Sequence, residues 1–90
     1  METINNFNTN QIENLNNIVK NIFSNNKLYY EWSVINDNTL YVYVENGDWK
    51  HDHISLKNIL TNNSFILIDR NVYETDEDCY SAEYTFMYMK

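Results

Sequence analysis

Proline is absent from this chain of 90 residues, and glycine and cysteine occur only once each, as Gly47 and Cys79. Without proline or repeated glycine, the chain cannot be a collagen-like, linker or proline-rich protein. Loops that bind phosphates or oxyanions usually need glycine for close backbone approach, so P-loop and dinucleotide-binding chemistry is excluded. A single cysteine cannot form an internal disulfide, which fits a reducing cytosol.

Basic residues are also scarce. The chain contains six lysines and arginines and 13 aspartates and glutamates, which gives a formal net charge of −7. Nucleic-acid binders use Lys and Arg to contact phosphates, so this balance argues against direct nucleic-acid partners and against anionic membrane surfaces. The excess charge is either a selected acidic surface or an ordinary aid to solubility, and the sequence leaves both open.

Long apolar runs are missing too. No stretch approaches the roughly 18 residues that a membrane span needs, and the first six residues lack the basic and apolar regions of a signal peptide. We therefore expect a cytoplasmic protein that has no membrane partner.

The chain does contain 43% hydrophobic and 16% aromatic residues, which is enough for a core and too much for a disordered segment. Ninety residues suffice for one small domain. We expect a flexible N-terminal tail over residues 1–8 and a single α+β domain over residues 9–90.

Apolar residues at helical spacing predict a first helix over residues 10–24, with a capping-box-like start at Asn10 and Glu13. A second helix is predicted from about Asp52 to the Thr-Asn-Asn at residues 61–63. The side chains expected to form its buried face are His53, Leu56, Ile59 and Leu60.

Four strands are expected. Residues 28–35 are rich in aromatic and β-branched residues, and residues 40–45 alternate, with Leu40, Val42 and Val44 on one side. The short Asn/Asp turn at 36–38 between them predicts an antiparallel hairpin. The apolar run at 65–68 predicts a central strand buried on both faces, and residues 80–88 predict a final strand. The acidic run at residues 74–78 is expected to be a solvated loop.

The order α-β-β-α-β-β predicts one four-stranded, mostly antiparallel sheet with both helices on one face. The order hints at a duplicated half, although no internal repeat is strong enough to support one. The other face of the sheet is expected to be open.

Tyrosine occurs eight times, and it is favoured at binding surfaces because it offers a large contact area with few rotatable bonds. Carboxylates spaced among aromatic rings imitate a nucleic acid and attract proteins with basic grooves. Alternatively, half of the tyrosines complete a small core. The predicted partner-binding residues are Tyr41, Tyr43, Glu45, Glu74, Asp76, Glu77 and Asp78.

The segment at residues 47–53, GDWKHDH, is the richest in ionisable side chains. Asp48, His51 and His53, together with Cys79, have the chemistry of zinc ligands or of a His/Cys enzyme. The spacings C-x-x-C and H-x-x-x-H are absent, however, which favours Asp52 as a helix cap and His53 as a packed side chain. We therefore predict no catalytic residue, no metal and no cofactor, and keep the enzyme as the alternative.

GDWKHDH, followed about 25 residues later by DCYSA at residues 78–82, resembles a pair of motifs in short uncharacterised proteins of phages and mobile elements. The resemblance covers roughly residues 40–88 and implies that the two motifs meet at one end of the sheet. That family has no established activity, so it implies no catalytic residue. In size, acidity and composition the chain is also similar to anti-CRISPR proteins, which are small phage-encoded inhibitors of CRISPR nucleases.

These observations lead us to expect a small acidic inhibitor of the phage type, acting in the cytoplasm of the host cell. It would bind the basic nucleic-acid-binding surface of a host defence or DNA-processing protein, such as a CRISPR effector, by mimicking nucleic acid. Both a monomer and a homodimer are compatible with the sequence.

Overall fold

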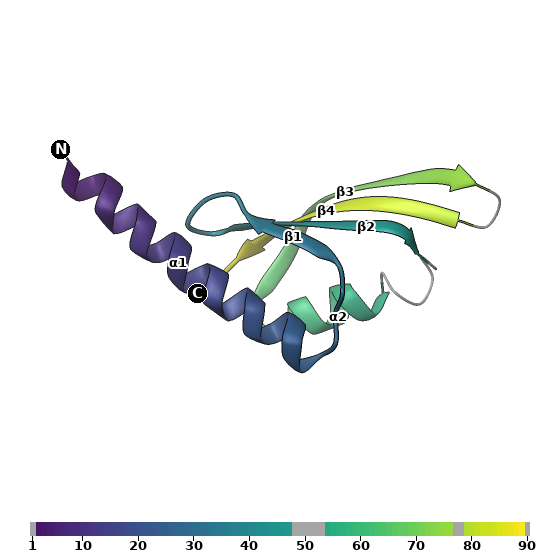
Figure 1. The fold of residues 1–90 in the computed structure, drawn as a ribbon, viewed down its shortest axis with the longest axis horizontal. Helices are drawn as coiled ribbons and strands as arrows, with labels where there is room; N and C mark the ends of the chain where they lie inside the picture. Colours follow the sequence, from purple (N-terminus) through teal and green to yellow (C-terminus); the bar gives the residue numbers. More distant parts are fainter. Residues whose placement is uncertain (1, 48–53, 77–78, 90) are drawn as a thin grey trace.

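The computed structural model describes the backbone of residues 2–47, 54–76 and 79–89 (Figure 1). Its elements, in chain order, are α1 (Glu2–Asn25), β1 (Glu31–Val34), β2 (Thr39–Gly47), α2 (Ile54–Asn62), β3 (Phe65–Asp76) and β4 (Cys79–Tyr88). The predicted order α-β-β-α-β-β and the α+β class are confirmed.

The four strands form one antiparallel sheet in the order β1-β2-β4-β3. Each hairpin contributes one inner and one outer strand, so β2 and β4 lie at the centre of the sheet. Both helices lie on the same side of the sheet (Figure 1). We call the opposite side, which neither helix covers, the open face.

The core lies between the sheet and the helices. Val19, Leu56 and Leu60 of the helices and Leu40 and Val42 of β2 are fully buried. The alternation predicted for β2 is confirmed, because Leu40, Val42 and Val44 all face the helices. The other buried apolar side chains are Leu15, Ile22, Phe23, Phe65, Ala82, Tyr84 and Phe86.

The apolar run at residues 65–68 does not form a central strand, contrary to the prediction. It begins β3, which is an edge strand, and Ile66 and Ile68 are 49% and 51% exposed. Ile66 pairs with Met87 on the open face, and Ile68 lies at a register shift between Leu67 and Asp69. Hydrophobicity does not by itself determine strand order. Strand β2 pairs with one edge of β4 and β3 pairs with the other edge, so β3 is the last strand of the sheet.

Helix α1 begins at Glu2, where the sequence predicted a flexible tail over residues 1–8 and a helix start near Asn10. Residues 2–9 contain neither proline nor glycine, so nothing in them breaks a helix. Once the packed part of a helix has formed, each further residue adds one hydrogen bond at little extra cost, which explains the extension. None of the helices in the described part of the chain is long and apolar enough to cross a membrane.

Helix α1 ends in a Schellman motif, the six-residue C-cap closed by two backbone hydrogen bonds. Leu28 N–H donates to the Phe23 carbonyl at 2.9 Å, and Lys27 N–H donates to the Ser24 carbonyl at 3.3 Å. Lys27 has a φ of 55°, the left-handed conformation that this motif requires. The turn directs Leu28 back against the core.

Helix α2 ends in a similar way. Ser64 has a φ of 74°, and Phe65 follows it into the core. Asn63 Nδ2 donates to the Ile59 carbonyl at 2.7 Å, just as Asn26 Nδ2 donates to the Ile22 carbonyl at 2.8 Å. The sequences around the two ends are also alike, VKNIFSNNKL at residues 19–28 and LKNILTNNSF at residues 56–65.

Candidate binding face of the sheet

The open face is built from alternate residues of all four strands. Side chains directly opposite each other in antiparallel strands lie on the same face, so the strand register identifies its rows. Glu31, Tyr43, Glu83 and Asn71 form one such row across the sheet. The neighbouring row is Ser33, Tyr41, Thr85 and Asp69.

A hydrogen-bonded cluster lies at the centre of this face. The Tyr41 hydroxyl of β2 donates to Oε2 of Glu83 at 2.7 Å, and the Tyr73 hydroxyl of β3 donates to Oε1 of the same carboxylate at 2.8 Å. Glu83 belongs to β4, the strand between them. Each carboxylate oxygen therefore accepts one phenolic hydrogen bond, and the carboxylate is held from both sides.

This cluster shifts the pKa values of its members in opposite directions. Burial, and then the hydrogen bond to Glu83, raises the pKa of Tyr41 to about 12. The hydrogen bond to Glu83 is the main reason that the pKa of Tyr73 is raised. Hydrogen bonds from Tyr41 and Tyr73 lower the pKa of Glu83, with partial desolvation opposing them. At neutral pH the cluster is therefore one carboxylate between two protonated phenols.

The described side chains give the open face a negative charge. Glu31, Glu45 and Asp69 are exposed there in addition to Glu83. The lysines and the arginine of the described part of the chain lie elsewhere, since Lys20 and Lys57 belong to the helices and Lys27 to the turn after α1. Arg70 pairs with Tyr84, whose ring is buried beneath the helices, so Arg70 is on the opposite side of the sheet.

A hollow of about 500 Å³ lies beside the cluster, along β1 and β2. Glu31 and Ser33 line it from β1, and Tyr41 and Tyr43 line it from β2. Tyr30 and Trp32 also line it, although their side chains pack against the core on the other side of the sheet. The hollow therefore combines two tyrosines and one exposed carboxylate.

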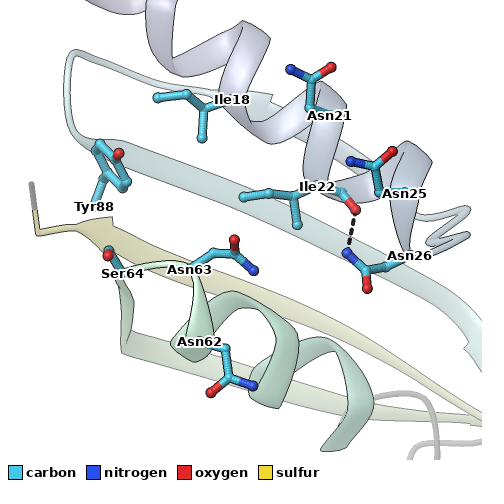
Figure 2. Close-up of a pocket in the computed structure, with 9 residues that line it drawn as sticks. All are labelled: Ile18, Asn21, Ile22, Asn25, Asn26, Asn62, Asn63, Ser64 and Tyr88. Carbon is cyan, nitrogen blue, oxygen red and sulfur yellow. Dashed lines mark hydrogen bonds between the residues drawn. The ribbon is translucent and has the colours of Figure 1, made fainter.

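A second pocket, of about 430 Å³, lies between the C-terminal ends of α1 and α2 (Figure 2). Five asparagines surround it, and the Asn26 amide is engaged with the Ile22 carbonyl. Its described lining contains no carboxylate, histidine, cysteine or basic side chain, and the hydroxyl groups of Ser64 and Tyr88 are the titratable or nucleophilic groups in it. The lining residues are Ile18, Asn21, Ile22, Asn25, Asn26, Asn62, Asn63, Ser64 and Tyr88.

The predicted partner-binding residues fall into two groups. Tyr41, Tyr43 and Glu45 lie on the open face, where Tyr43 is directly opposite Glu83 and Tyr41 is hydrogen-bonded to it. The acidic run does not form the predicted loop throughout, because β3 continues to Asp76 and pairs Glu74 with Tyr80 and Asp76 with Cys79. Hydrogen bonding to β4 outweighs the low strand preference of acidic residues there. Glu77 and Asp78 lie outside the described residues.

The alternative metal or His/Cys site falls mostly outside the described residues, which include neither Asp48, His51 nor His53. Cys79 is the first residue of β4. Within the part of the chain that the structure describes, no group of three or more His, Cys, Asp or Glu residues is placed to hold a metal ion. Gly47 pairs with Tyr80, so the beginning of GDWKHDH and the centre of DCYSA lie side by side at one end of the sheet.

Among the acidic and tyrosine side chains that the structure describes on the open face, four were not predicted as site residues, namely Glu31, Asp69, Tyr73 and Glu83. Strand alternation alone would have placed Glu83 there, since it is out of phase with the apolar Ala82, Tyr84 and Phe86. No comparable pattern joins Tyr73 to Glu83, because their contact depends on the register of the hairpin formed by β3 and β4.

The chain was compared with known proteins, and no protein-family model, curated protein or solved structure matches it.

Proposed function

We propose that this protein is a small inhibitor of the phage type that uses the open face to bind the basic nucleic-acid-binding surface of a host defence or DNA-processing protein. The single observation that carries the proposal is the fixed carboxylate of Glu83, held by Tyr41 and Tyr73 on a face whose other described charges are all acidic. A CRISPR effector is one protein of the required kind.

Charge complementarity supports a basic partner. Glu31 and Glu83 occupy the same row on strands separated by β2, which is two strand spacings, roughly 10 Å. The Debye length at physiological ionic strength is about 8 Å, so a basic group that approaches between the two carboxylates is within one Debye length of both and is attracted by both. Such a face steers a basic surface towards it and repels nucleic acid.

The tyrosine rings supply packing contacts, which charge attraction alone does not provide. Tyr41 and Tyr43 are half-buried, and Tyr73 is 48% exposed, so each presents part of its ring to solvent. Tyrosine is enriched among the residues that dominate binding energy in protein interfaces. The hydrogen bonds to Glu83 also order two of these rings before binding, which lowers the entropy lost on association.

The test begins with the protein immobilised on a resin and a bacterial lysate passed over it. A protein retained at low salt and released by a salt gradient is then purified, and its affinity for a fluorescent DNA duplex is measured against increasing amounts of the inhibitor. We expect the DNA to be displaced in proportion to the inhibitor added. A retained protein that binds DNA equally well at every inhibitor concentration would contradict the proposal.

A further inference from the structure

Tyr43 lies between two carboxylates on the open face. The register places Glu31 of β1 directly opposite Tyr43 on one side and Glu83 of β4 directly opposite it on the other. The hollow of about 500 Å³ opens on the β1 side of this row. Ser33, which is small, faces Tyr41 there, so the space above β1 is bounded by the larger tyrosines of β2.

The carboxylates of Glu31 and Glu83 differ in their hydrogen bonding. Both oxygens of Glu83 already accept phenolic hydrogen bonds. Glu31 is exposed, and no hydrogen bond or ion pair joins its carboxylate to any residue that the structure describes. The carboxylate that borders the hollow is therefore the one whose acceptor positions are available to a ligand.

An exposed carboxylate beside a tyrosine ring is better suited to bind the guanidinium of arginine than the ammonium of lysine. A guanidinium is planar and weakly hydrated, so it can stack on an aromatic face while its edge donates two hydrogen bonds to a carboxylate. A lysine ammonium is compact and strongly hydrated, and it gains less from such a ring.

We infer that the hollow binds one arginine side chain of the partner, with the guanidinium stacked on Tyr43 and donating to the Glu31 carboxylate. This inference rests on the proposed function and goes beyond it, because it specifies which basic residue of the partner is recognised and where.

The inference is tested by NMR titration of the full chain with two peptide amides of equal charge, acetyl-GRGRG and acetyl-GKGKG. We expect the arginine peptide to shift the backbone resonances of residues 31–33 and 41–43, and to bind about fivefold more tightly than the lysine peptide, as a cation–π contribution of about 1 kcal/mol implies.

The Glu31→Gln variant should lose this preference for arginine. Its matched control is Glu13→Gln, which removes one exposed carboxylate from α1 and leaves the open face unchanged. Because both changed positions are on the surface, neither variant should disturb folding. The control should bind the arginine peptide as the unchanged chain does.

Several results would overturn the inference. Equal affinity for the two peptides would show attraction to positive charge without recognition of arginine, and would leave the proposed inhibitor function standing. Equal losses in Glu31→Gln and Glu13→Gln, or resonance shifts confined to the asparagine-lined pocket, would place the binding elsewhere. A concentration-dependent dimer that Arg70→Lys dissociates would assign the hollow to a second copy of this chain.

The proposed inhibitor function can also fail while the inferred arginine site is correct. If the arginine peptide binds as expected but the inhibitor displaces no DNA from any retained protein, the hollow recognises arginine and the proposed inhibitor function is wrong.

Discussion

The hydroxyl of Tyr41 donates a 2.7 Å hydrogen bond to Oε2 of Glu83, although the strand register pairs Tyr41 with Thr85 and Glu83 with Tyr43. The bond is therefore diagonal, between neighbouring rows of the open face, and long side chains can span that separation. Tyr73 approaches the same carboxylate from β3. Three strands thus fix the position of one negative charge at the centre of the face.

Tyr41→Phe tests this cluster directly. The change removes one of the two phenolic donors, so we expect the pKa of Glu83 to rise towards its ordinary value of 4.5. NMR titration of the Glu83 carboxyl carbon measures the shift. Tyr29→Phe is the matched control, because Tyr29 is 87% exposed and should leave Glu83 unaffected. An unchanged Glu83 titration in Tyr41→Phe would show that the hydrogen bond is absent in solution.

Stability should decrease at alkaline pH. The pKa values of Tyr41 and Tyr84 are raised from 10.0 to about 12, in both cases mainly by burial. Above pH 10 the unfolded chain loses these protons while the folded chain retains them, so the unfolded state binds fewer protons and stability falls as pH rises. Below pH 10 this contribution is fully present. Urea unfolding followed by circular dichroism between pH 8 and 11 measures the loss, and a flat profile would contradict it.

Lys27→Gly should stabilise the fold. Lys27 holds a φ of 55° at the end of α1, a conformation that costs residues with a Cβ more than it costs glycine. We expect a gain of about 0.5–1 kcal/mol in the free energy of unfolding. Lys20→Gly, in the middle of the same helix, should instead cost about 1 kcal/mol. Urea denaturation measures the stability of both variants, and a loss of stability in both would contradict the left-handed C-cap at Lys27.

Leu60→Ala tests the packing of α2 on the sheet. Leu60 is fully buried in the core, so truncating it should cost about 2–5 kcal/mol, through lost burial and a new cavity. Ile54 belongs to the same helix but is 57% exposed, and Ile54→Ala should change stability by no more than about 0.5 kcal/mol. Similar melting temperatures for the two variants would mean that α2 does not pack as described.

The sequence predicted best where alternation is regular. Leu40, Val42 and Val44 alternate with Tyr41, Tyr43 and Glu45, and this pattern alone identified both faces of β2. Burial on one face of a sheet makes such alternation obligatory, because a slip of one residue would expose every apolar side chain.

Prediction failed where the outcome depends on partners distant in the sequence. The run at residues 65–68 is apolar enough for a central strand, but strand order is decided by which hairpin edges meet. The contact of Tyr73 with Glu83 depends on the register of β3 and β4, including the shift between Leu67 and Asp69. The likeness of residues 19–28 and 56–65 was missed because it is short, and it became evident only when both segments ended a helix in the same way.

We propose that the carboxylates of the open face compete with nucleic acid for a basic partner. The most direct measurement is displacement of a DNA duplex from that partner by Glu31→Gln/Glu83→Gln, compared with Glu13→Gln/Asp37→Asn. Both double variants lose two negative charges, and Glu13 and Asp37 are exposed residues outside the strands. We expect that at least about tenfold more of the open-face variant is needed to displace the DNA, equivalent to about 1.4 kcal/mol, and that the control behaves like the unchanged chain. Equal displacement by the two double variants would contradict it.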